Sequence, residues 1–139
     1  MKYLFVFVLF TLSIQSCTKY ADGPLFSLLT KKARITNTWK LESYMINNSD
    51  YTPDAEIKLT IEKDGTFSES TVINALGQIQ STHRHGTWIF MEGKAQISMT
   101  ESGTNTLPVN YSIRELKSSR FKIRRTINNN NYEWTYIAE

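Results

Sequence analysis

Three side chains in the middle of the chain have the chemistry of a metal site or of an acid/base pair. They are Glu69, His83 and His85, and a single residue separates the two histidines, which places both imidazoles on one face of a strand. Two histidines without a paired cysteine or an HExxH spacing do not define a zinc site, so we predict no metal and no cofactor. The same groups can orient a ligand in an apolar pocket, or they can lie on a solvent-facing part of a strand.

The sequence lacks the familiar signatures of catalysis. It has no Gly-x-Ser-x-Gly nucleophile elbow, no phosphate-binding loop and a single cysteine, Cys17. We therefore predict that the protein is not an enzyme.

One arginine interrupts the apolar face of a late strand. Phe121, Ile123 and Ile127 alternate with polar residues, and this alternation puts Arg125 on the apolar face. An unpaired buried charge costs several kcal/mol, so Arg125 requires an anion, several carbonyl groups or an aromatic ring face. A ligand carboxylate held by Arg125 is one interpretation, and a structural role is the other.

Three tryptophans are candidate contacts for an apolar ligand. Trp39 and Trp88 lie in two similar segments, 34–44 and 85–90, and Trp134 shares a strand face with Tyr132 and Tyr136. Each can equally belong to a packed core, because aromatic side chains suit the interiors of β-rich proteins. The candidate ligand-binding set is Trp39, Glu69, His83, Trp88, Arg125 and Trp134.

The N-terminal residues have the pattern of a lipoprotein signal peptide. Lys2 is followed by residues 3–14, which are apolar apart from Thr11 and Ser13. A helix of that length spans only about 18 Å, which is shorter than a bilayer core of about 30 Å, so we predict no permanent transmembrane span. The segment ending at Ser16-Cys17 resembles a bacterial lipobox, which implies cleavage after residue 16 and lipidation of Cys17.

We therefore divide the chain into a signal peptide at 1–16, a lipidated cysteine with a tether or arm at 17–33, and one folded domain at 34–139. Within the arm, 25–33 can form a short helical turn or an extended segment that covers one end of the domain. The alternative is an ordinary secretory peptide that leaves Cys17 as a free thiol. Thr18 follows the cysteine where an Asp would signal inner-membrane retention, and this analogy favours the outer membrane.

Size and charge limit the possible functions. The chain has 139 residues, 12% of them aromatic, and a formal net charge of +3, which fits one β-rich domain. That charge is too small to indicate nucleic acid binding. Basic residues cluster between positions 114 and 125, which fits an acidic membrane surface or glycan, or simply the solvated faces of strands.

Apolar and polar residues alternate through most of the domain, the period of half-buried strands. In the first segment this puts Trp39, Leu41, Ser43 and Met45 on one face and Lys40, Glu42 and Tyr44 on the other. We expect strands at 34–44, 57–61, 66–74, 78–90, 95–99, 107–113, 120–127 and 132–137, with a hairpin at Gly65 and a β-bulge at Gly86. This order predicts an eight-stranded antiparallel up-and-down barrel, with a β-sandwich as the alternative.

The chain resembles the lipocalin-like lipoproteins of Bacteroidetes, small barrels of the calycin type. The residues that carry the resemblance are the lipobox, 22–24, 32–34, 38–41, the 63–67 hairpin and 86–88. The resemblance implies that Trp39 plugs the closed end of the barrel and that Arg125 packs over its ring. It also implies binding of small hydrophobic molecules.

Two functions are compatible with these observations. The first is a lipid-anchored envelope protein whose barrel binds a small hydrophobic or amphipathic ligand, which requires an internal cavity open at one end. The second is a structural or interaction subunit of an envelope complex, with a filled barrel and an exposed apolar patch.

Overall fold

The computed structural model describes residues 20–22, 28–103 and 106–139. Its elements, in chain order, are α2 (Lys31–Ile35), β1 (Asn37–Ile46), β2 (Ser49–Asp50), β3 (Glu56–Ile61), β4 (Thr66–Ala75), β5 (Gln78–Met91), the 3-10 turn η1 (Glu92–Lys94), β6 (Gln96–Glu101), β7 (Val109–Leu116), β8 (Arg120–Ile127) and β9 (Asn130–Ala138). The predicted signal peptide and Cys17 lie outside the described residues.

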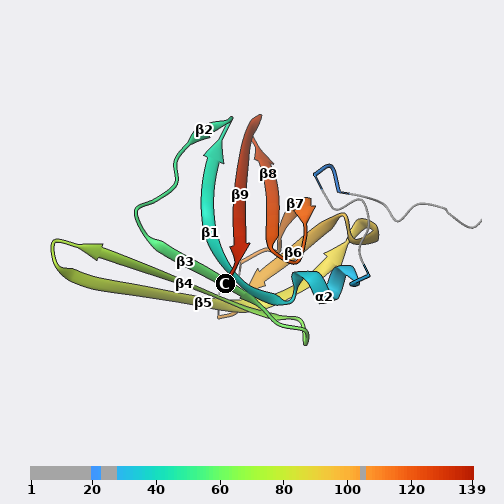
Figure 1. Ribbon diagram of the computed structural model, residues 1–139, viewed down its shortest axis with the longest axis horizontal. Helices are drawn as coiled ribbons and strands as arrows, with labels where there is room; N and C mark the ends of the chain where they lie inside the picture. Colours follow the sequence, from blue (N-terminus) through green and yellow to red (C-terminus); the bar gives the residue numbers. More distant parts are fainter. Residues whose placement is uncertain (1–19, 23–27, 104–105) are drawn as a thin grey trace, which may run out of the picture.

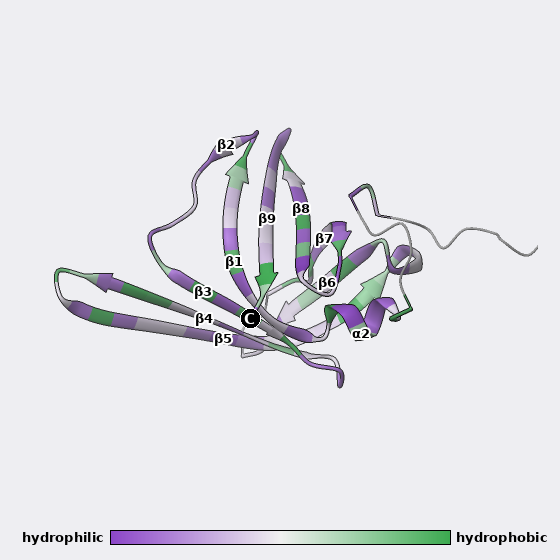
Figure 2. Cartoon of the chain, viewed as in Figure 1, coloured by the Kyte–Doolittle hydropathy of each residue, from purple (hydrophilic) through white to green (hydrophobic). Residues whose placement is uncertain are grey.

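The eight long strands form a closed antiparallel barrel, as the sequence predicts. Each strand from β3 to β8 pairs with the next along the chain, and β1 closes the barrel by pairing with both β3 and β9. Closure leaves no open sheet edge along most of the barrel, which removes a route to aggregation. Figure 2 shows hydrophilic and hydrophobic residues alternating along β8, the pattern of a strand with one face in the core and one in water.

A short helix closes the end of the barrel where β1 begins (Figure 1). The side chain of Thr30 caps α2 by accepting a hydrogen bond of 3.1 Å from the Ala33 amide. Ile35, at the end of α2, is fully buried, and its carbonyl accepts a 2.8 Å hydrogen bond from Trp39 Nε1. The helix spans the predicted boundary between arm and domain at residues 33 and 34, so the folded unit includes the end of the arm.

The core is concentrated at this closed end. Trp39, Ile61, Leu116 and Phe121 are almost completely buried, and the rings of Trp39 and Phe121 lie 5.5 Å apart. Each such side chain contributes about 1.5–3 kcal/mol by leaving water. The position of Trp39 matches the plug that the resemblance implies.

A β-bulge in β1 changes which side chains face inward. Pairing with β9 shifts register between Leu41 and Ser43, so Glu42 is an extra residue in the strand. Trp39 and Leu41 face inward as predicted, but beyond the bulge Tyr44 lines the interior. The predicted inward positions of Ser43 and Met45 are therefore wrong.

Gly86 is required by a close backbone approach and not by the predicted bulge. The pairings of Gly86 with Phe67 and with Glu101 belong to unbroken registers. A Cβ atom at Gly86 would lie 2.0 Å from the Thr100 carbonyl oxygen and 2.7 Å from the Phe67 ring. The predicted hairpin at Gly65 is present, with φ of +97°.

The β4–β5 hairpin extends well beyond the barrel wall (Figure 1). Pairing between β3 and β4 stops at Val72, and pairing between β5 and β6 stops at Gly86, so only the two strands of the hairpin continue. Its outer part exposes several apolar side chains, among them Ile73, Leu76 and Ile79.

The basic cluster at 114–125 is largely neutralised on the outer surface of the barrel. Arg124 contacts Glu133 at 2.8 Å, Arg120 contacts Glu42 at 2.7 Å, and Lys117 forms a salt bridge with the buried Glu115. Because most of these charges are paired, the cluster is not a free basic patch for an acidic membrane or glycan. The solvated-face interpretation is the one that fits.

Candidate ligand cavity

The interior of the barrel is hollow beyond its packed closed end. A cavity of about 250 Å³ lies inside it, open to solvent on one side and at the small end of ligand pockets in general. Every long strand contributes at least one lining side chain. The lining residues are Leu41, Tyr44, Pro53, Ile57, Leu59, Glu69, Arg84, Met99, Tyr111, Ile123, Trp134 and Tyr136.

Trp134 is the centre of the aromatic wall of this cavity. It stacks on Tyr44 with ring centroids 5.1 Å apart and meets Tyr111 edge-on at 5.5 Å. Tyr132 stacks on the same indole at 6.4 Å. Rings packed in this way restrict one another's rotation, so a molecule that contacts the wall would cost less side-chain entropy.

Two phenol groups give the cavity polar character without filling it. Burial raises the pKa of Tyr111 and of Tyr136 above the ordinary value, so both hydroxyls are protonated donors at neutral pH. Neither hydroxyl forms a hydrogen bond with another described residue. Both hydroxyls are thus available to a polar group of a ligand.

A salt bridge crosses the cavity wall between β4 and β5. Arg84 Nε and Nη2 donate to the two carboxylate oxygens of Glu69 at 2.7 and 2.9 Å. The Glu69 side chain is only 14% exposed, whereas that of Arg84 is 46% exposed. The bidentate geometry fixes both side chains and cancels their charges within the cavity.

Arg125 lies near the open mouth of the barrel and not over Trp39. On β9, Arg125 is paired with Tyr132, whereas Trp39 is paired with Ala138 six residues away, a separation of about 20 Å along the strand. Phe121 occupies the position next to the Trp39 ring. The predicted cation–π role of Arg125 is therefore wrong.

The surroundings of Arg125 are those of an unmatched charge at the edge of the cavity. Its side chain shares the inward face of β8 with Phe121 and Ile123. It forms no salt bridge within the described part of the chain. Its positive charge counteracts the rise in the pKa of Tyr111. Arg125 therefore lies on the inward face of β8, two residues beyond the cavity-lining Ile123.

A second, smaller cavity of about 90 Å³ adjoins the first. Arg84, Met99 and Tyr111 line both cavities and form the partition between them. The smaller space is completed on its far side by Phe67, Glu101 and the segment that includes Leu107.

The structure brings only some of the predicted ligand contacts together. Glu69 and Trp134 line the cavity, whereas Arg125 is not a lining residue and lies further along β8, on the same strand face as Ile123, which does line it. Trp39 and Trp88 belong to the core instead; Trp88 donates from Nε1 to the Glu62 carbonyl at 3.0 Å. Tyr44, Arg84, Tyr111 and Tyr136 line the cavity but were absent from the predicted set.

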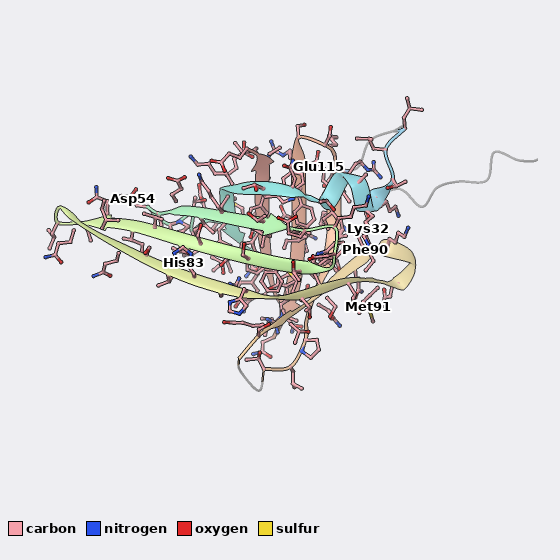
Figure 3. All side chains as sticks on the ribbon, turned by 90° about the horizontal axis from the view of Figure 1, so that it is seen from below. Lys32, Asp54, His83, Phe90, Met91 and Glu115 are labelled. Carbon is pink, nitrogen blue, oxygen red and sulfur yellow. The ribbon has the colours of Figure 1, made fainter. Side chains whose placement is uncertain are left out.

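His83 faces away from the cavity. Directly paired residues on antiparallel strands share a face, and Glu69 is paired with Arg84. His83 and His85 therefore lie on the opposite, exposed face of β5, and Figure 3 places His83 along the β4–β5 hairpin. Across the described ranges, no three His, Cys, Asp or Glu side chains are grouped so as to hold a metal ion.

One signal in the sequence could have found Arg84. A two-residue turn at Leu76-Gly77 pairs Ala75 with Gln78, and counting back along both strands pairs Glu69 with Arg84. Tyr44 also had a signal: two polar residues in succession, Glu42 and Ser43, interrupt the alternation where the register with β9 shifts.

The fold and the cavity define the class of protein: a small closed β-barrel with an internal, partly polar cavity. A family model described as a lipocalin-like domain matches residues 35–123, more than half of the chain. The chain belongs to the lipocalin-like domain family. No curated protein matches it in sequence.

Among solved structures, the chain is similar to an odorant-binding protein from bovine nasal mucosa. The match has a TM-score of 0.46 and 9% sequence identity, and it covers 82% of this chain and 77% of that one. In the part of this chain that the structure describes, no helix is long and apolar enough to cross a membrane.

Proposed function

We propose that this protein binds a small amphipathic molecule, with the apolar part of the ligand inside the barrel and an anionic head group at the mouth. The size of the cavity, about 250 Å³, supports a compact ligand. Its apolar lining supports the binding of a hydrocarbon part. This cavity supports ligand binding over the alternative of a filled barrel that serves as an interaction subunit.

The charge balance of the cavity carries the proposal. Glu69 matches the charge of Arg84 through two hydrogen bonds, whereas Arg125 has no acidic partner among the described residues. One net positive charge therefore acts on the mouth. A carboxylate or similar anion would satisfy it, with hydrogen bonds to a charged group worth about 1.5–3 kcal/mol.

The test compares two probes that differ only in head group, octanoate and octan-1-ol, by isothermal titration calorimetry. We expect octanoate to bind at least tenfold more tightly, since about 1.4 kcal/mol corresponds to a factor of 10. The substitution Arg125→Gln should remove this preference and leave octan-1-ol binding unchanged. Arg124→Gln is the matched control, because Arg124 is paired with Glu133 on the outer face.

Equal affinity for the two probes, or an unchanged preference in Arg125→Gln, would refute the proposed head-group site. Native mass spectrometry of protein purified without detergent provides an independent check. A stoichiometric co-purifying anion would support the proposal, and its identity would replace octanoate as the probe.

We further propose that the protein is anchored to the bacterial envelope by a lipid on Cys17, in the outer membrane. The support is the lipobox-like segment and the position of the single cysteine at its end. Mass spectrometry of the mature protein should show an N-terminal Cys17 that carries a diacylglyceryl group. An unmodified thiol at that position would contradict the anchor.

A further inference from the structure

The first described residues are firmly attached to the closed end of the barrel. Tyr20 is 7% exposed, and its hydroxyl donates a 2.6 Å hydrogen bond to the Lys94 carbonyl of η1. Its ring lies under the Lys31 ammonium, 4.6 Å from the centroid. The Asp22 amide donates to the Arg114 carbonyl of β7 at 2.9 Å. These contacts hold Tyr20–Asp22 against three separate elements.

The short distance from Tyr20 to Cys17 limits where the barrel can lie. The two residues are three steps apart along the chain, so their Cα atoms are within about 11 Å of each other in any conformation. A lipid on Cys17 lies at the interface of its bilayer. The closed end therefore has to stay close to the lipid head groups for as long as Tyr20 is docked.

The surface around α2 and η1 has the composition of an interfacial face. Lys32, Lys63 and Lys94 are exposed there and form no salt bridge within the described ranges, and the Leu28 side chain is 91% exposed. Figure 3 shows Lys32 at the α2 end of the molecule. Lysines and apolar side chains together suit the head-group region of an anionic bilayer.

Three carboxylates lie among these lysines, and two are engaged locally. Asp64 accepts a 2.7 Å hydrogen bond from Thr66 Oγ1, and Glu92 accepts one of 2.9 Å from Gln96 Nε2. The third, Glu62, is exposed. The named charges of this face therefore balance in number, so the exposed Leu28 and the short link to Cys17, more than net charge, favour its contact with the head groups.

The mouth of the cavity lies at the other end of the barrel. The β1–β2 and β8–β9 turns lie at the top of Figure 1, away from α2, and Asn47 Nδ2 joins them by donating to Asn130 Oδ1 at 2.7 Å. The cavity-lining residues Tyr44 and Pro53 belong to the segments that flank the β1–β2 turn. We infer that the closed end rests on the head-group surface of the bilayer that holds the Cys17 lipid, so that the cavity opens away from that bilayer. This inference rests on the lipidation proposed above.

An orientation of this kind has a consequence for ligand exchange. A molecule would enter and leave the cavity from the aqueous side, or from a surface facing the anchoring membrane, and not by lateral diffusion within that membrane.

The experiment uses the full lipidated protein in vesicles of phosphatidylethanolamine and phosphatidylglycerol that contain a head-group quencher. Because Cys17 is the only cysteine and carries the lipid, a single introduced cysteine can be labelled selectively with a fluorophore. Lys63→Cys reports on the closed end and Ser49→Cys on the rim of the mouth; both positions are exposed. We expect quenching at position 63 to be at least threefold stronger than at position 49.

A third variant tests the cause of the orientation. Tyr20→Ala removes the docked ring and the hydrogen bond to Lys94, so the difference in quenching between the two labels should fall towards zero. Equal quenching without this substitution, or stronger quenching at position 49, would overturn the inference while leaving the anchor intact. Protein that lacks the acyl mass and does not float with vesicles would overturn the anchor and the orientation together.

Discussion

Glu69 and Arg84 face each other across the β4–β5 hairpin inside the barrel, joined by hydrogen bonds of 2.7 and 2.9 Å. The pair decides the charge of the cavity, because it neutralises one of the two arginines that act on it. It also joins the wall of the main cavity to that of the smaller one, since Arg84 lines both.

Breaking this pair should destabilise the protein more than breaking a pair on the outer surface. Arg84→Met leaves the largely buried Glu69 carboxylate without its partner, and we expect a loss of about 1–2 kcal/mol in the free energy of unfolding, reduced by the half-exposed position of Arg84. Arg124→Met, on the outside, should cost less than about 1 kcal/mol. Urea denaturation measures both, and equal losses would contradict the special position of Glu69.

The double variant Glu69→Gln with Arg84→Met provides a second test of the same pair. Because the uncompensated carboxylate is then absent, the double variant should be more stable than the sum of the single losses predicts, with a coupling of about 1 kcal/mol. Additive losses would indicate that the two groups do not interact in solution.

Gly86→Ala should be strongly destabilising. The added Cβ would meet the Thr100 carbonyl oxygen at 2.0 Å, and backbone on the neighbouring strand cannot rotate away as a side chain can. We expect a loss of about 3 kcal/mol or more. Gly77→Ala is the matched control, because nothing lies within 4 Å of the Cβ position at Gly77. Only the φ of +77° opposes this substitution, and we expect it to lower the free energy of unfolding by about 1 kcal/mol. Similar unfolding midpoints for the two variants would refute the close approach.

Ligand binding should be reported by one tryptophan in particular. Trp134 lines the cavity, whereas Trp88 is 4% exposed and lies in the core. We expect Trp134→Phe to abolish the change in fluorescence on titration with octanoate, and Trp88→Phe to retain it. A response that disappears only in Trp88→Phe would place the ligand outside the cavity described above.

Docking of the N-terminal segment should fail at high pH. Burial raises the pKa of Tyr20 from 10.0 to about 12, and the nearby Arg34 acts in the opposite direction. A raised pKa means that the docked state favours the neutral phenol. The contribution of the Tyr20 side chain to docking is therefore complete below pH 10 and is lost as the pH rises through about 12.

Tyrosinate absorbance measures this titration as the difference between the unmodified protein and Tyr20→Phe. The difference should have its midpoint near pH 12. Tyr51→Phe calibrates the absorbance of a single phenol, because the Tyr51 side chain is 59% exposed. A Tyr20 midpoint near pH 10 would show that the segment is not docked in solution.

The alternation of residue types in the sequence was sufficient to predict the barrel. Apolar residues at every second position identify the strands. The turns between them are too short for the crossover that parallel strands need, so neighbouring strands must pair antiparallel. The turn at Gly65 was predicted on the same local grounds, whereas the burial of Trp39 at the closed end was implied by the family resemblance. Such predictions succeed because they depend on residues that are neighbours in the chain.

The composition of the cavity depended instead on pairing between distant strands. The single extra residue at Glu42 turns Tyr44 inward, and the register of the β4–β5 hairpin puts Arg84, and not His83, beside Glu69. A shift of one residue moves every later side chain to the other face of a strand.

The sequence by itself therefore determined the class of fold, the order of the long strands and the hairpin at Gly65. Only the tertiary structure decided which polar groups share the cavity and where Arg125 lies relative to Trp39. The physical reason is that strand periodicity is a local property of the backbone, whereas bulges and registers are set when the barrel closes and all eight strands must satisfy their hydrogen bonds together.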